Sequence, residues 1–580
     1  MDGINKIISL LSNIFQTGIV TNVYITFNGE GMKRILSITL ITVLFSTLAY
    51  SKQFKRKPLR KISSNDLISQ ISKSEREITL KLNEVINTVK PAKLQDGSPD
   101  YEKTAKKVKQ AIEKIVIIAL ENPKSDMAQL YKSAAEHIPM FKGFIYRLRR
   151  VAEVSDIAYI SAIWALKQFK QTSSFRAPYM EALFDLATMP NPKEEIHGQV
   201  GMFINVSELQ DWLITNIAPK FTKTINVMKK IAYSSGSGTH PIGMINAELL
   251  VGEVIAQKYE PSKGSHKEWI LTSGHLIGLV SILENYMGSM YYLSSYNLEK
   301  LAELSNVLVK ETFISIKGPA SRSEIFSKLG SRVDLLSTKR VYELTHPESG
   351  LFGKNSKGKR SKTSYKNFMT IRETAKKKVQ GTNFSNRLKA AQSFFTAAAN
   401  DQLQYHYAMI DTYGMNNEDK LLINPESYKA TLNLTPYINQ EEILKRSITV
   451  LEANGPITLN DHFIKKKYTV NISTLFDIEK VNDLREFFPN KFLDSLKEKK
   501  PSKPKGSSWF TKNIEKWKTN YSWNYSYNKA IQWKDPSFGG LLPNVNADRQ
   551  GDELSLHLIN VGSLPEIPYV SLWLSMFYGY

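Results

Sequence analysis

Two Glu-x-x-His pairs are the arrangement in this sequence that comes closest to a metal centre. Glu194 precedes His197 and Glu343 precedes His346, at a spacing that places both side chains on one face of a helix. Two such pairs, with two further glutamates, form the di-iron site of helical-bundle carboxylate proteins. However, each histidine directly precedes a glycine or a proline, so both pairs fall at helix ends. We therefore predict no metal and no cofactor, and keep these four residues only as metal candidates.

Other catalytic chemistries leave little trace in the sequence. The chain has no cysteine, which excludes disulfides, thiolate nucleophiles and iron-sulfur clusters. The Gly-Ser-rich segment at 234–238 has neither the spacing of a phosphate-binding loop nor that of a nucleophile elbow. The paired carboxylates of a glycoside hydrolase are defined by their separation in space and leave no spacing in the sequence. A hydrolase therefore stays an alternative without assigned catalytic residues.

Positive charge is the strongest compositional feature. The chain of 580 residues carries 77 lysines and arginines against 55 acids, a formal net charge of +22. The densest run lies at 354–378, with Tyr365 and Phe368 interleaved. Its basic residues, the candidate anionic-ligand site, are Lys354, Lys357, Lys359, Arg360, Lys362, Lys366, Arg372, Lys376, Lys377 and Lys378. Nucleic acid, acidic lipid and acidic polysaccharide all fit such a run, and so does a solvated linker.

Aromatic residues concentrate near the end of the chain. The segment 509–580 contains five of the eight tryptophans. Flat aromatic faces stack on sugar rings, so Trp509, Trp517, Trp523 and Trp533 are candidate stacking residues for a glycan. The alternative is that these side chains fill a hydrophobic core.

The segment 32–51 has the pattern of a secretory signal peptide. Lys33 and Arg34 precede an apolar run that ends in small residues, which predicts cleavage after Ser51. Such a signal belongs at the start of a chain, so we expect Met32 to be the true start and 1–31 to be a mis-annotated extension. Gly29-Glu30-Gly31 supports this, because its codons are purine-rich, as in a ribosome-binding site. The alternative is an uncleaved membrane anchor at 35–51, favoured by the basic flank at 52–62.

Apolar residues at helical spacing dominate from residue 62 to about 415. One helix is predicted from Leu67 to Val89, with Pro91 as its stop, and a second from Val108 to Leu120. The apolar stretch 269–293 is predicted to be a buried helix, with Gly274 and Gly278 spaced for close approach of another helix. Further helices are predicted at 127–137, 141–170, 178–188, 207–232, 242–258, 267–310 and 384–413.

The predicted fold is mainly α, a multi-helix, bundle-like body followed by a smaller α+β, aromatic-rich C-terminal region. After the flank at 52–62, the predicted parts are the helical body at 63–345, a basic linker at 346–383, a long helix at 384–415 that completes the body, a small α+β domain at 416–496, a linker at 497–508 and the aromatic-rich region at 509–580.

Three functions are compatible with these sequence features. The first is an exported bacterial envelope protein, in the periplasm or outside the cell, that binds anionic or glycan surfaces without catalysis. The second is an exported hydrolase of envelope polymers, which would need two carboxylates of different pKa in a cleft that excludes water. The third is a cytoplasmic nucleic-acid-binding protein, which would bind through 354–378 and lose affinity steeply with salt.

Overall fold

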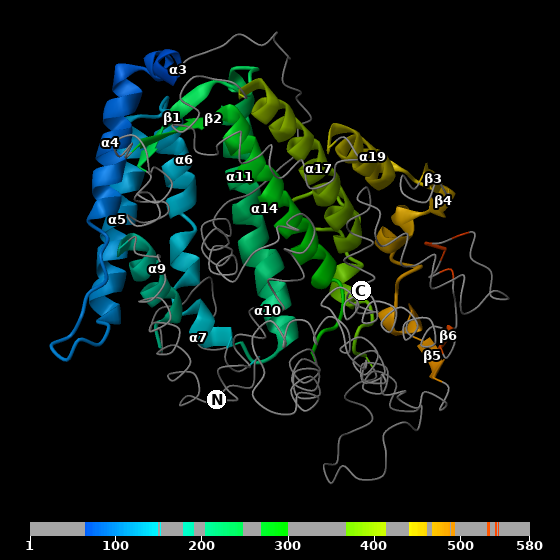
Figure 1. Ribbon diagram of the computed structural model, residues 1–580. Helices are drawn as coiled ribbons and strands as arrows, with labels where there is room; N and C mark the ends of the chain where they lie inside the picture. Colours follow the sequence, from blue (N-terminus) through cyan, green and yellow to red (C-terminus); the bar gives the residue numbers. More distant parts are fainter. Residues whose placement is uncertain are drawn as a thin grey trace, which may run out of the picture. The chain divides into compact units, whose positions relative to one another are not determined.

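The computed structural model describes just under half of the chain. The described residues are 64–148, 151, 178–190, 203–246, 268–299, 367–412, 440–460, 467–487, 489–492, 531–533, 537, 540, 541 and 543. Within them the chain is mainly α, with three two-stranded antiparallel sheets (Figure 1). These residues belong to two compact units, one within Tyr24–Tyr291 and Ala390–Ile448 and the other within Tyr292–Lys389 and Thr449–Tyr580. The predicted mainly α fold with a smaller α+β part is confirmed.

Helices make up most of the described chain. The α-helices are α3 (Ser64–Gln70), α4 (Lys73–Asn87), α5 (Tyr101–Glu121), α6 (Asp126–Ala135), α7 (Phe144–Leu148), α9 (Pro178–Thr188), α10 (Val206–Trp212), α11 (Ala218–Ser234), α14 (Ser273–Leu293), α17 (Arg387–Thr412) and α19 (Gln440–Glu452). Short 3-10 turns are η1 (Ile138–Phe141), η5 (Glu373–Ala375), η7 (Ile472–Phe476) and η8 (Leu484–Phe487). A π-helical turn, η2 (Leu213–Ile217), joins α10 to α11.

The strands form three antiparallel pairs. They are β1 (Pro241–Asn246) with β2 (Glu268–Thr272), β3 (Ile457–Asn460) with β4 (Lys467–Val470), and β5 (Pro489–Phe492) with β6 (Ile531–Trp533).

Side-chain caps fix where the first helices begin. The hydroxyl of Ser72 accepts a hydrogen bond from the backbone N–H of Glu75, at 3.0 Å, and so starts α4. Such a cap satisfies an N–H that has no partner within the helix. The single helix predicted from Leu67 to Val89 is therefore wrong at one point, because Ser72 divides it into α3 and α4. Asp100 caps α5 in the same way, at 2.9 Å from the N–H of Lys103.

Most of the predicted helices are present. The second helix corresponds to α5, which begins earlier than predicted. The structure also confirms the helix at 178–188 with its predicted bounds, and the helices at 127–137, 207–232 and 384–413 with ends shifted by a few residues. The helix predicted at 141–170 is described only as far as Leu148, where α7 covers its beginning.

The helix predictions around the first sheet are wrong in part. Residues 242–246 belong to β1 and residues 268–272 to β2, where helices were expected. A short apolar run does not separate a strand from a buried helix by periodicity, and here the pairing of two such runs decides for the strand. The helix expected to reach residue 310 ends at Leu293 as α14. Residues 247–258 and 300–310 lie outside the described part.

A large hydrophobic core lies in the first unit. It gathers side chains from α4, α5, α6, α11, α14 and α17, together with the first sheet. Leu82, Met127, Ile225, Leu276 and Val280 are among its fully buried members. The burial of α14 confirms the prediction for the apolar stretch, except that its first residues form β2. None of the described helices is long and apolar enough to cross a membrane.

Helix α14 packs closely on α17 through three glycines. A Cβ on Gly278 would lie 2.7 Å from the ring of Tyr405, and a Cβ on Gly288 would lie 2.7 Å from the ring of Phe395. A Cβ on Gly274 would lie 2.3 Å from the Cβ of Ala408. The glycine spacing in the sequence therefore correctly predicted a close helix contact, and the contacting helix is α17.

A buried histidine joins η1 to α11. The Nε2 atom of His137 lies 2.7 Å from the hydroxyl of Thr224, and its ring stacks on Phe221 at 5.1 Å between centroids. Burial, with smaller contributions from Lys220 and Lys223, lowers the pKa of His137 to about 4. The ring is therefore neutral at pH 7.

This histidine should make the stability depend on pH. The unfolded chain binds a proton to His137 near pH 6.5, whereas the folded chain does so only near pH 4, so acid favours unfolding. We expect the free energy of unfolding to fall by about 3 kcal/mol between pH 7 and pH 4 through this group. Urea titrations of the wild type and His137→Gln across this range measure the effect. An equally steep loss in His137→Gln would contradict it.

Candidate functional site

The four residues predicted as metal candidates lie in parts of the chain that the structure does not describe. Glu194, His197, Glu343 and His346 all lie outside the described residues. Among the residues that the structure does describe, no three His, Asp or Glu side chains gather to hold a metal ion.

Part of the predicted basic site is described. Lys354, Lys357, Lys359, Arg360, Lys362 and Lys366 lie outside the described residues, whereas Arg372, Lys376, Lys377 and Lys378 lie within them. Of the predicted stacking residues, Trp509, Trp517 and Trp523 lie outside. Trp533 ends β6, where its backbone pairs with Pro489.

The described basic residues lie on a loop that buried side chains anchor. This basic loop, residues 372–383, belongs to the second unit. Ala375 is fully buried and Val379 is 6% exposed, so both sides of the lysine triplet are fixed. The end of the predicted linker at 346–383 is thus packed against the fold, with an isolated β-bridge between Ile371 and Tyr296.

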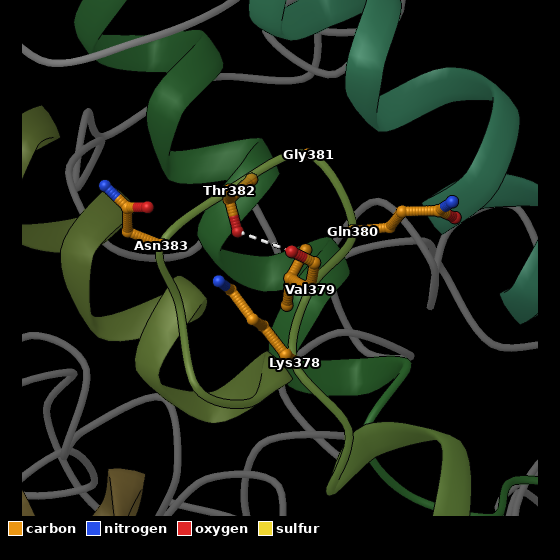
Figure 2. Close-up of a pocket in the computed structure, with 6 residues that line it drawn as sticks. All are labelled: Lys378, Val379, Gln380, Gly381, Thr382 and Asn383. Carbon is orange, nitrogen blue, oxygen red and sulfur yellow. Dashed lines mark hydrogen bonds between the residues drawn. The ribbon is translucent and has the colours of Figure 1, made fainter.

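Hydrogen bonds close the end of the basic loop into a turn. The carbonyl of Val379 accepts bonds from the N–H and the hydroxyl of Thr382, at 3.2 and 2.8 Å. The N–H of Val379 donates to the carbonyl of Phe384 at 3.0 Å. Gly381 has a φ of +75°, a conformation that glycine adopts without strain. Figure 2 shows this turn, with the bond from Thr382 to Val379 dashed.

The three lysines of the basic loop are exposed and consecutive. Lys376 forms an ion pair with Glu373 at 2.9 Å, and this hydrogen bond and charge raise the pKa of the lysine. Beside the triplet lies a shallow hollow of about 590 Å³, lined by Lys378, Val379, Gln380, Gly381, Thr382 and Asn383 (Figure 2). Its rim therefore combines one ammonium group with amide and hydroxyl groups, which suits a polar, anionic ligand.

The structure also contains a polar site that the sequence patterns did not predict. In the first unit, the Nζ atom of Lys229 on α11 lies 2.7 Å from Glu284 Oε1 on α14 and 2.7 Å from Asp401 Oδ2 on α17. The three side chains are only 6%, 0% and 5% exposed. A charged side chain is almost never buried so completely unless it is paired with a side chain of opposite charge.

Tyr233 completes this arrangement from α11, one helical turn after Lys229. Its hydroxyl donates to Asp401 Oδ1 at 2.7 Å, so the two oxygens of Asp401 face different donors. Glu284 makes polar contacts with Lys229 and Asp401. We refer to Lys229, Tyr233, Glu284 and Asp401 as the buried charge cluster.

The buried charge cluster holds one more carboxyl than it has cations. Burial and the neighbouring Asp401 raise the pKa of Glu284 well above its usual value, against the opposing effect of Lys229. Burial lowers the pKa of Lys229, but Glu284 and Asp401 together outweigh it and leave that pKa raised. Because a net charge in a dry core is expensive, we infer one ammonium, one carboxylate and one protonated carboxyl, with the proton on Glu284.

The sequence did contain a signal for this cluster. Lys229 lies on the apolar face of α11, which it shares with the buried residues Ile225, Met228 and Ala232. A lysine on the buried face of an amphipathic helix needs a carboxylate partner. Its partners could not be located, because Glu284 and Asp401 lie on helices far away in the sequence.

The chain matches no protein-family model, and comparisons with curated proteins and with solved structures found no similar chain.

Proposed function

We propose that this chain is an exported envelope protein that binds anionic surfaces, including acidic glycans, without catalysis. The observation that carries this proposal is the triplet Lys376, Lys377 and Lys378, three exposed lysines in a row on an anchored loop. The net charge of +22 adds a long-range field that attracts anionic polymers.

Anchoring of the basic loop favours binding for an entropic reason. A mobile segment would lose conformational freedom when it binds, at a cost of about 1–2 kcal/mol for each residue that becomes ordered. Here the buried side chains of Ala375 and Val379 already hold the backbone on both sides of the lysines. The lysine side chains are then the main groups that lose freedom on binding.

The hollow next to Lys378 supports an acidic glycan as the ligand class. Lys378 offers a charge to the carboxylate or sulfate of such a ligand, and the amide of Asn383 or of Gln380, which point to opposite sides of the turn, offers a polar contact to a sugar hydroxyl (Figure 2). An acidic polysaccharide would place both kinds of group on one chain.

Export is supported by the sequence pattern at 32–51, which lies outside the described residues. Mass spectrometry of the natively expressed protein, after cell fractionation, tests it. A mature N-terminus at Lys52 in the periplasm or medium is the expected result. A peptide that begins before Met32, or an intact segment 32–51 in the membrane fraction, would overturn it.

The buried charge cluster does not favour the hydrolase alternative. Hydrolysis of a polymer requires that two carboxyl groups reach the scissile bond from either side. Glu284 and Asp401 are 0% and 5% exposed and both contact Lys229, so a polymer in solution does not reach them.

Removal of the lysine triplet should weaken binding to a polyanion. We expect the variant Lys376→Gln/Lys377→Gln/Lys378→Gln to bind heparin about tenfold more weakly at physiological salt, since each exposed ion contact contributes about 0.5 kcal/mol. Calorimetric titration with heparin measures the loss, which should shrink at high salt.

A charge-matched variant controls for net charge alone. Lys103→Gln/Lys106→Gln/Lys109→Gln removes three exposed lysines from α5 and should leave heparin affinity within about twofold. Equal losses in the two variants would contradict a localised site. Tighter binding to duplex DNA than to heparin, with steep loss of affinity as salt rises and no dependence on sugar identity among glycans, would instead favour the nucleic-acid alternative.

A further inference from the structure

The buried charge cluster holds a primary amine against two carboxyl groups in a nearly dry interior. Lys229 Nζ lies 2.7 Å from one oxygen of each carboxyl, and the three side chains are at most 6% exposed. All four residues of the cluster belong to the same compact unit. An amine and an acid held at this distance can condense to an amide, a reaction that bulk water normally opposes.

We propose that Lys229 and Asp401 become joined by an amide bond between Nζ and Cγ, and that Glu284 transfers the protons. The product is an isopeptide cross-link between α11 and α17. The reaction needs no oxidant, reductant or co-substrate, because its only second product is one molecule of water.

The surroundings of the two carboxyls assign their roles. Asp401 Oδ1 accepts the hydroxyl of Tyr233 at 2.7 Å, a donor placed to stabilise negative charge that develops on this oxygen when the amine attacks. Glu284 has no such donor from Tyr233, and it contacts both Lys229 and Asp401. Asp401 is therefore the electrophile and Glu284 the acid-base group.

The protons balance within the cluster. Glu284 gives its proton to Asp401 Oδ2 and takes one from the ammonium of Lys229, which leaves a neutral amine and a protonated Asp401. The amine attacks Cγ, and the bond from carbon to nitrogen forms. Glu284 then protonates the departing Oδ2 hydroxyl and accepts a proton from the nitrogen, so the bond from carbon to Oδ2 breaks and water leaves. Glu284 ends in its starting state.

Two physical effects favour this reaction in the fold. Positioning removes the entropy cost of bringing the reactants together, and exclusion of water shifts the equilibrium from hydrolysis toward condensation. The chain has no cysteine, so it has no disulfide with which to cross-link distant segments.

The test is mass spectrometry of the full-length purified protein. Tryptic digestion should release a branched peptide in which the segment containing Lys229 is joined to the segment containing Asp401, lighter by one water than the sum of the two. If the two segments appear only as separate, unmodified peptides, the proposal is wrong. Loss of water from the Asp401 peptide alone, without a branch, indicates an internal succinimide and also overturns it.

Variants test the assigned roles. Lys229→Arg and Glu284→Gln should abolish the branched peptide, while Lys230→Arg, an exposed neighbour on α11, should retain it. Tyr233→Phe should form the branch about a hundredfold more slowly, as expected when one donor to the developing oxyanion is lost. Circular dichroism checks that each variant folds. A branch formed at the wild-type rate in folded Glu284→Gln would refute the role of Glu284, and the wild-type digest decides the cross-link whether or not the variants fold.

Discussion

Replacement of Lys229 by methionine should lower the free energy of unfolding by about 3–5 kcal/mol. The reason is that Glu284 and Asp401 would remain buried without Lys229, which pairs with them as a cation before the amide bond forms and keeps Asp401 uncharged once it has formed. A buried carboxyl that loses its partner bears its full desolvation cost. Chemical denaturation followed by circular dichroism measures the loss.

Lys230→Met is the matched control for this prediction. Lys230 is exposed on the same helix, so its replacement should change stability by no more than about 0.5 kcal/mol. A triple variant, Lys229→Met with Glu284→Leu and Asp401→Leu, should recover most of the loss, because an apolar set of similar volume replaces all the charges. If Lys229→Met lowers the free energy of unfolding no more than Lys230→Met does, Lys229 does not stabilise the fold through Glu284 and Asp401.

Replacement of Gly274 by alanine should lower the free energy of unfolding by about 2–3 kcal/mol. The added Cβ would lie 2.3 Å from the Cβ of Ala408 and 3.0 Å from the carbonyl oxygen of Gly238, neither of which is the flexible end of a side chain. Alanine gains up to about 1 kcal/mol of helix propensity over glycine, which does not offset this overlap. Thermal and urea unfolding measure the change.

A compensating substitution provides the decisive control. Ala408→Gly removes the opposing methyl group, so the double variant should be more stable than Gly274→Ala alone, a coupling that a double-mutant cycle detects. Gly455→Ala, where a Cβ meets nothing within 4 Å, should be nearly neutral. Additive effects of the two substitutions would show that α14 and α17 do not meet at these residues.

Sequence patterns predicted helix boundaries correctly where a residue type with a known preference for helix ends marks them. The helix predicted at 178–188 begins and ends as α9 does, since it starts at a proline, a residue favoured in the first turn of a helix. The break at Ser72 was missed because the apolar spacing continues across it, although a serine three residues before a glutamate is a known capping pattern. Local chemistry therefore carried more information than periodicity at this point.

The remaining errors arise from contacts between distant segments. Residues 241–246 form a strand because residues 268–272 pair with them, which neither segment shows alone. The buried charge cluster was missed for the same reason, because its residues come from three helices far apart in the sequence. The lysine triplet at 376–378 was predicted because its charges are adjacent in the sequence. Exposed charge is visible in the sequence, but ion pairs between α11, α14 and α17 exist only after the chain folds.

The π-helical turn η2 divides a long helical segment into two faces that are out of phase. A π-turn holds one residue more than a regular α-turn, so positions after it are rotated by about 100° relative to an unbroken helix. Before the turn, Trp212 stacks on Phe144 at 5.5 Å, and after it Lys229 faces the buried carboxyls. The extra residue therefore rotates the positions of α11 about the helix axis relative to α10. In this way one continuous helical segment makes an aromatic contact before the turn and an ionic contact after it.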